Sequence, residues 1–196
     1  MELLQYISCI SSFYKTKNNV GNYRKDAIAE LLVTVAQQMV VAARTAPKGK
    51  GVSNMEMMII EGEDVKILAR RLATMGQELG VASFVRDAGN LEHSPVVFAI
   101  GTRISPLGLK KCGLCGFENC TEKTKYPLVP CSFNTGDLGI AIGSAASVAM
   151  DNRVDNRIMY TAGQALIDLK WLGDDIRIAY VIPLSATSKN IFFDRS

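Results

Sequence analysis

Four cysteines lying close together are the residues best suited to chemistry in this 196-residue chain. Cys112, Cys115 and Cys120 lie in the run Lys-Lys-Cys-Gly-Leu-Cys-Gly-Phe-Glu-Asn-Cys, and Cys131 follows in Pro-Cys-Ser, which gives the spacing C-x2-C-x4-C-x10-C. Thiolates are soft ligands that select iron–sulfur clusters and zinc. Four of them within 20 residues can surround one metal centre. The spacing therefore favours a protein that handles electrons.

The residues around the cysteines favour an iron–sulfur cluster over zinc. Gly113 and Gly116 each follow a cysteine and give the backbone the freedom to curl around a cluster. Zinc sites with four cysteines typically use two close pairs, whereas this chain has one close pair followed by gaps of four and ten residues. Zinc remains an alternative, and a [2Fe–2S] centre also takes four cysteines. Lysines flank the cysteines as possible counter-charges: Lys110, Lys111, Lys123 and Lys125.

Composition and charge argue against several classes of partner. A net charge of +3 is too small to indicate nucleic-acid binding. We expect no membrane-spanning helix, because no run of about twenty uninterrupted apolar residues occurs. The first residues begin with Glu2 and lack the positive start of a secretory signal, so we expect a cytoplasmic protein. In that reducing compartment clustered thiols favour metal over disulfides, and the fifth cysteine, Cys9, lies far from the other four.

Alternating helical and strand patterns predict the elements that must hold this cysteine loop. Residues 1–22 are predicted to be an N-terminal extension, and residues 23–196 a single α+β domain in which residues 106–131 form an inserted metal-binding module. Ser132 is expected to cap the helix that follows the module. The apolar residues of the tail, Ile191, Phe192 and Phe193, are expected to pack on the domain. Periodicity predicts helices over residues 23–44, 64–79, 135–151 and 156–172, and strands over residues 55–61, 96–100 and 176–182.

Several motifs, in order, resemble one family of prokaryotic ferredoxin-domain proteins, DUF2148. They are AARTAPKGKG from residue 42, DLGIAIGSA from residue 137, RVDNRIM from residue 153, and the tail that runs from IPLS to FFDR. The cysteine run itself resembles the [4Fe–4S] module of electron-transfer subunits of the RnfB type and of corrinoid iron–sulfur proteins. The resemblance covers nearly the whole chain from about residue 24 onward. It implies a [4Fe–4S] cluster and a fold, and no particular reaction.

A second resemblance is to the nitroreductase fold, in which a helix, an Ala-Pro pair, a loop of small residues and a strand begin the flavin site. It implies a three-layer α+β sandwich with the four-cysteine loop inserted, and a homodimer that binds FMN at its interface. The sequence departs from that pattern at Lys48, where those flavoproteins have other polar residues. The cations that could bind a flavin phosphate are Arg44, Lys48, Lys50 and Arg195, and the alternative is a solvated basic loop.

These observations support two hypotheses about function. In the first, Cys112, Cys115, Cys120 and Cys131 bind one [4Fe–4S] cluster, and electrons pass to a bound flavin or to an unidentified donor or acceptor protein. With flavin bound, such a protein would be a small oxidoreductase. In the second, the fold is a binding or structural module in which the four cysteines hold zinc or a structural cluster. The single histidine, His93, is expected at the entrance of a strand and not in an acid–base role.

Overall fold

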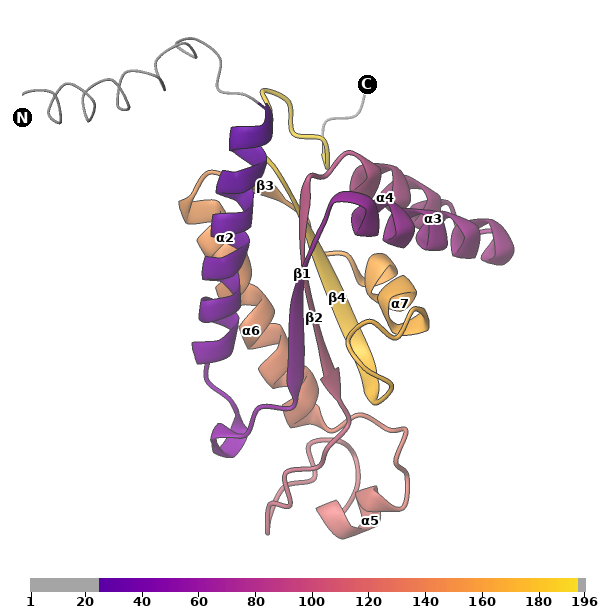
Figure 1. Ribbon diagram of the computed structural model, residues 1–196. Helices are drawn as coiled ribbons and strands as arrows, with labels where there is room; N and C mark the ends of the chain where they lie inside the picture. The colour runs from indigo at the N-terminus through magenta and orange to yellow at the C-terminus, as the bar shows by residue number, and fades with distance from the viewer. Residues whose placement is uncertain (1–24, 194–196) are drawn as a thin grey trace, which may run out of the picture.

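An antiparallel sheet between two layers of helices forms the described part of the computed structural model, residues 25–193 (Figure 1). The strands are β1 (Met55–Glu61), β2 (Val96–Arg103), β3 (Asp155–Asn156) and β4 (Ile176–Ser185), in the spatial order β1-β2-β4-β3. Each neighbouring pair of strands is antiparallel. The predicted α+β three-layer sandwich is thereby confirmed.

Helices cover both faces of the sheet, so its central strand is buried on both sides. α2 (Lys25–Thr45) and α6 (Ser132–Asp151) pack on one face, and α3 (Gly62–Leu79), α4 (Ala82–Glu92) and α7 (Tyr160–Asp168) pack on the other. Along β2, Val97 and Ala99 point to the core beneath α3, α4 and α7, while Phe98 and Ile100 point to the core beneath α2 and α6. This alternation follows from the two-residue period of a strand, and it explains the unbroken apolar run in the sequence.

The long helix α2 is apolar because one of its faces packs in the core of the domain. Residues 27–45 are long and apolar enough to cross a membrane by length and composition, and no other described helix meets that test. Leu32, Ala36 and Met39 are buried, at three- and four-residue steps, against the sheet and α6. The apolar stripe of α2 is thus used in packing the domain.

Two short helices and the tail complete the fold. The 3₁₀ turn η1 (Gly49–Gly51) follows α2, and α5 (Cys120–Thr124) lies within the cysteine loop. Of the three tail residues expected to pack on the domain, Phe192 is 3% exposed and Ile191 packs beside it against the core formed with α3, α4 and α7, whereas Phe193 is 58% exposed. The extension of residues 1–22 lies outside the described residues, as do Cys9 and Arg195.

Most predicted elements are present, with shifted ends. The strand over residues 55–61 is confirmed as β1, while β2 and β4 extend three residues beyond their predicted ends because each pairs along its length with the other. The helix predicted over residues 135–151 begins earlier: Ser132 is its first residue, and Cys131, not Ser132, holds the N-cap position.

In the layer formed by α3, α4 and α7, one predicted helix is wrong and one helix was missed. Residues 156–172 do not form one helix, because Asp155 and Asn156 pair with β4 and Met159 bridges Val181, which leaves α7 to begin at Tyr160. Pairing with the sheet overrides the helical periodicity of that segment. The helix α4 was not predicted, although its buried residues recur at helical steps.

Candidate metal centre

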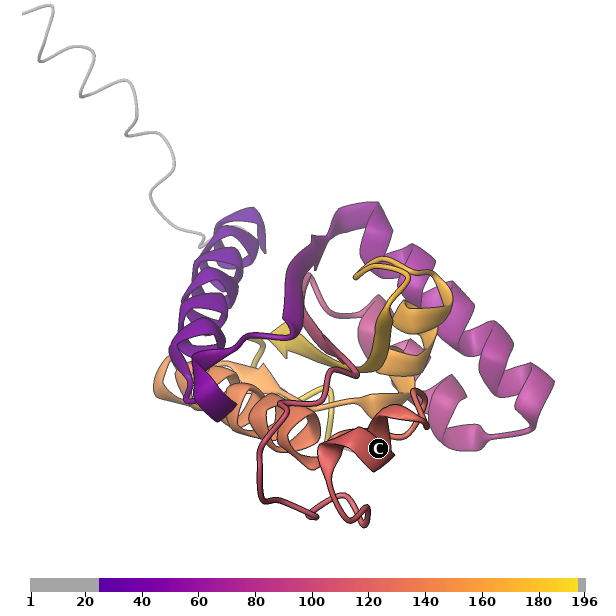
Figure 2. The same cartoon turned by 90° about the horizontal axis from the view of Figure 1, so that it is seen from below.

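The cysteine loop, residues 106–131, lies between β2 and α6 at one end of the sheet (Figures 1 and 2). Apart from α5 it is irregular. Asn119 caps α5 by accepting a hydrogen bond from the Glu122 N–H at 3.0 Å, and the rings of Phe117 and Tyr126 stack with their centroids 5.2 Å apart. These local contacts fold the module on itself without a large apolar core.

All four predicted cysteines line one small cavity inside this module. Each is a free thiol, and Cys131, at 6% exposed, is the most buried of them. The cavity measures about 10 Å³, close to the space that one water molecule needs. It is lined by Pro106, Leu107, Leu109, Cys112, Gly113, Cys115, Asn119, Cys120, Lys123, Cys131, Ser132 and Phe133. Cysteines that are up to 19 positions apart in the sequence therefore line the same cavity.

The thiols are not gathered at the spacing of a single-ion site. Within residues 25–193, no three histidine, cysteine or carboxylate side chains lie close enough to hold one metal ion. With zinc–sulfur bonds of about 2.3 Å, the thiolates of a zinc site lie within roughly 4 Å of one another. Binding a larger centre at this cavity requires the loop to move outward. The donor set itself, four thiols on one cavity, fits an iron–sulfur cluster.

Two glycines give the loop its curvature. Gly113 has a φ of 101° and Gly116 a φ of 87°, both in the region that side chains disfavour. The Gly116 N–H donates to the Gly113 carbonyl at 2.9 Å and closes a tight turn between Cys112 and the third cysteine, Cys120. The sequence prediction that glycine bends the chain around the cysteines agrees with this geometry.

The first turns of α6 fix the fourth cysteine and both flanking segments. Cys131 is the N-cap and its side chain makes no capping hydrogen bond, so the positive end of the helix dipole lies at a sulfur open to a ligand. Asn134, 1% exposed, accepts a hydrogen bond from the Ser105 N–H at 2.8 Å, which ties the entrance of the loop to α6. Its amide nitrogen is buried with no hydrogen-bond partner.

One turn further along α6, Asp137 binds the loop that follows α2. Both of its carboxylate oxygens accept from the Gly49 N–H, at 3.1 and 3.0 Å. The Lys50 ammonium donates to the Leu107 carbonyl at 3.2 Å, and Leu107 lines the cysteine cavity. A Cβ on Gly49 would lie 2.4 Å from the Leu107 side chain, so the two loops are in direct contact there. Sequence reasoning missed this role of Asp137, although the residue lies in one of the resembling motifs.

The predicted flavin-phosphate residues are only partly grouped. The Lys48 ammonium donates to the carbonyls of Ala43, Arg44 and Ala46 at 3.0, 2.9 and 2.7 Å, so it caps the end of α2. Burial lowers the pKa of Lys48, and the nearby Asp137 carboxylate partly offsets that shift. Arg44 and Lys50 are exposed near the same loop.

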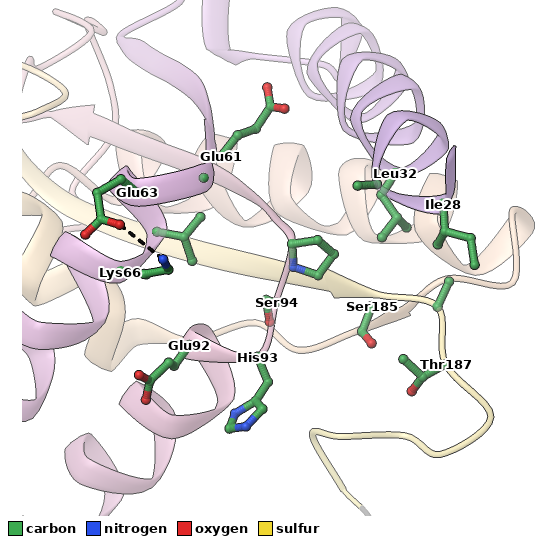
Figure 3. Close-up of a pocket in the computed structure, with 15 residues that line it drawn as sticks. Ile28, Leu32, Glu61, Glu63, Lys66, Glu92, His93, Ser94, Ser185 and Thr187 are labelled. Atoms are coloured by element: carbon green, nitrogen blue, oxygen red, sulfur yellow. Dashed lines mark hydrogen bonds and ion pairs between the residues drawn. The ribbon is translucent and has the colours of Figure 1, made fainter. Parts of the chain in front are cut away.

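A larger cavity of about 670 Å³ lies at the opposite end of the sheet (Figure 3). Ile28 and Leu32 of α2 line one side, and Glu63 and Lys66 of α3 lie across from them. His93 also lines this cavity; it is the C-cap of α4, exposed, and its Nδ1 lies 2.7 Å from the Gly89 carbonyl oxygen. His93 is therefore at a strand entrance, as predicted, and away from the cysteines.

The arrangement of sheet and helices is that of the nitroreductases. The nitroreductase CinD from Lactococcus lactis in complex with nicotinic acid superposes with a TM-score of 0.56 at 8% identity, over 87% of this chain and 82% of that one. A nitroreductase family protein from Clostridium novyi NT gives a TM-score of 0.54 at 13% identity, over 89% and 79%. A BluB-like flavoprotein from Clostridium difficile 630 gives 0.51 at 18% identity, over 87% of both chains.

The comparison of sequences identifies the family of this chain. An uncharacterized protein from Archaeoglobus fulgidus is 35% identical over 179 residues, which cover 88% of this chain and 96% of the relative. The chain belongs to the DUF2148 family, described as uncharacterized proteins containing a ferredoxin domain, whose pattern matches residues 129–195. The matched segment includes Cys131 and leaves out the other three cysteines. The ferredoxin domain in the family's description points to a redox role.

We expect Asp137→Ala to destabilise the protein, because the partly buried Gly49 N–H then loses its acceptor. The free energy of unfolding should fall by about 1–3 kcal/mol, measured by urea denaturation. Asp137→Asn should cost less, since its amide oxygen can still accept. Asp151→Ala, at the exposed end of the same helix, is the matched control and should change stability by less than about 0.5 kcal/mol. Equal losses for Asp137→Ala and the control would contradict this role.

Proposed function

We propose that this protein is an iron–sulfur redox protein in which Cys112, Cys115, Cys120 and Cys131 bind one [4Fe–4S] cluster. When bound, such a cluster supplies one-electron transfer. The electrons would pass to a bound flavin or to a partner protein. The observation that carries the proposal is the convergence of the four free thiols on one cavity. That all of them are free suits a reducing compartment, and we propose a cytoplasmic location.

The residues of the module have separate tasks in this proposal. Gly113 and Gly116 turn the backbone so that the first three thiols face inward. Cys131 is held by α6, which gives one rigid ligand against which the rest of the loop closes. Leu114, at 71% exposed, and Leu128, at 76%, present apolar side chains to solvent on the same module. Exposed apolar groups beside a redox centre are suited to docking an electron-transfer partner.

The first experiment is an iron and sulfide assay on protein purified without oxygen. We expect about four iron and four sulfide per chain. Replacing any one of the four clustered cysteines by serine should sharply lower both contents, since a thiolate ligand is lost. Cys9→Ser is the matched control and should keep them. Stoichiometric zinc without sulfide in the wild-type protein would refute the proposal and favour the structural module.

We further propose FMN as an electron acceptor within the same molecule. The oxidoreductases of similar fold include an FMN-dependent nitroreductase from Clostridium difficile R20291. Arg44 and Lys50 are the predicted phosphate ligands that remain exposed, since Lys48 is bound to backbone carbonyls. Their loop contacts Leu107 on the wall of the cysteine cavity, which would place a flavin bound there next to the module. The remaining predicted ligand, Arg195, stays a prediction.

Fluorescence titration with FMN tests this second proposal. We expect quenching of flavin fluorescence by the wild-type protein, and the double variant Arg44→Gln/Lys50→Gln should bind at least about tenfold more weakly because two charge-assisted contacts are lost. Arg70→Gln, an exposed change on α3, is the control and should leave the affinity unchanged. If the wild-type protein does not bind FMN at all, the acceptor lies in another protein.

We also propose that the protein is a homodimer joined through the outer side of the α2 and α6 layer. Val41 on α2 is 61% exposed and Ile140 on α6 is 49% exposed, so each of the two helices carries an exposed apolar side chain that a second copy would cover. Val41→Glu/Ile140→Glu should convert the dimer to a monomer in light scattering. Val85→Glu, an exposed apolar position on α4, is the control and should leave the mass unchanged. A monomeric wild-type protein would contradict the proposal.

A further inference from the structure

Lys123 is a buried lysine on the wall of the cysteine cavity. It lies in α5 between Cys120 and the end of that helix, and only 1% of its surface is exposed. It lines the same cavity as the four thiols. Lysine is almost never fully buried unless its charge is paired, so this position calls for a physical explanation.

Within residues 25–193 the Lys123 ammonium makes no hydrogen bond or ion pair. The adjacent carboxylate, Glu122, binds Lys125 at 2.9 Å on the exposed side of the helix. The two lysines of α5 thus have different environments, since Lys125 is paired in solvent while Lys123 is enclosed beside sulfur. Removing a charge from water is costly unless an opposite charge compensates for it.

The cavity itself is where the compensating charge would lie. Four thiolates around a [4Fe–4S]²⁺ core carry a net charge of −2, and the uptake of one electron makes it −3. The side chain of Lys123 lines the cavity, so its positive charge lies close to that site. Such a charge favours both cluster states over the empty site, and it favours the more negative, reduced state most.

We propose that Lys123 is the counter-charge of the cluster, stabilising the loaded module and raising its reduction potential. This inference rests on the proposed function. The electron comes from an external reductant, one iron changes from ferric to ferrous, and no bond is formed or broken. Lys123 acts as a positioning charge and takes no part in ligation. The exposed lysines of the loop, Lys110, Lys111 and Lys125, are screened by water and contribute little.

The test compares Lys123→Met and Lys123→Gln with Lys123→Arg and with Lys125→Met as the matched control. Each full-length protein is purified anaerobically, and its potential is measured by titration with dithionite. We expect the two neutral variants to shift the reduction equilibrium at least tenfold toward the oxidised state, which is about 59 mV for one electron. Lys123→Arg and Lys125→Met should stay close to the wild-type potential.

A second readout separates charge from packing. The thermal midpoint is measured with the cluster bound and after its removal by chelation. Without the cluster, the thermal midpoint of Lys123→Met should be higher than that of the wild-type protein, because an uncompensated buried charge is gone. When the cluster binds, the midpoint of Lys123→Met should rise by less than that of the wild-type protein. A lysine that serves only as packing would destabilise both forms when replaced.

The outcomes distinguish this inference from the function on which it rests. Iron and sulfide in the wild-type protein, together with an unchanged potential in both neutral variants, would overturn the role of Lys123 and leave the cluster in place. A wild-type protein that binds no iron and sulfide would overturn both. A lower thermal midpoint for Lys123→Met than for the wild-type protein, both measured after removal of the cluster, would also contradict the role of Lys123 as a counter-charge.

Discussion

The structure depends on the first two turns of α6, which hold together three segments that are far apart in the sequence. Cys131, Asn134 and Asp137 recur at three-residue steps, so they lie on neighbouring parts of one helical face. Through them the helix meets the cysteine cavity, the entrance of the loop at Ser105 and the turn at Gly49. The positions of the cysteine loop and of the basic loop therefore follow from a single helix.

The sheet makes this arrangement rigid. β2 is buried on both faces and leads directly into the cysteine loop, while α6 leads out of it and packs against α2. Both ends of an irregular segment are thus anchored in the core, and the segment between them contributes no residue to either core cluster. Inserting a module of mostly polar residues costs the fold little when its ends are fixed in this way.

Much of this could be predicted from the sequence, for identifiable reasons. The cysteine spacing and its glycines locate the module, because few other functions place four thiols and two glycines so close together. The strands of the core were located by their continuous apolar residues, and the family by several ordered motifs. Helix ends were harder, since Asn156 and Met159 pair with a strand distant in the sequence. The bond between Asp137 and Gly49 could not have been predicted, because it joins residues 88 positions apart.

The different environments of the two lysines of α5 could not be predicted from the sequence either. Lys123 and Lys125 look alike as flanking charges, and only the fold shows that one is buried beside sulfur while the other is paired in solvent. The same holds for the basic loop, where Lys48 and Lys50 are alike in sequence but bind different carbonyls. Composition gives the number of charges, whereas burial decides their effect.

The narrowness of the cavity between the cysteines has a consequence for biogenesis. If the cysteines bind the proposed cluster, a space of about 10 Å³ is too small for it, and the segment between Ser105 and Cys131 would have to open to let iron and sulfide enter. Since both ends of that segment are fixed to finished elements, it can open as a flap while the sheet stays intact. The polypeptide could thus complete its fold first and bind the proposed cluster in a later step.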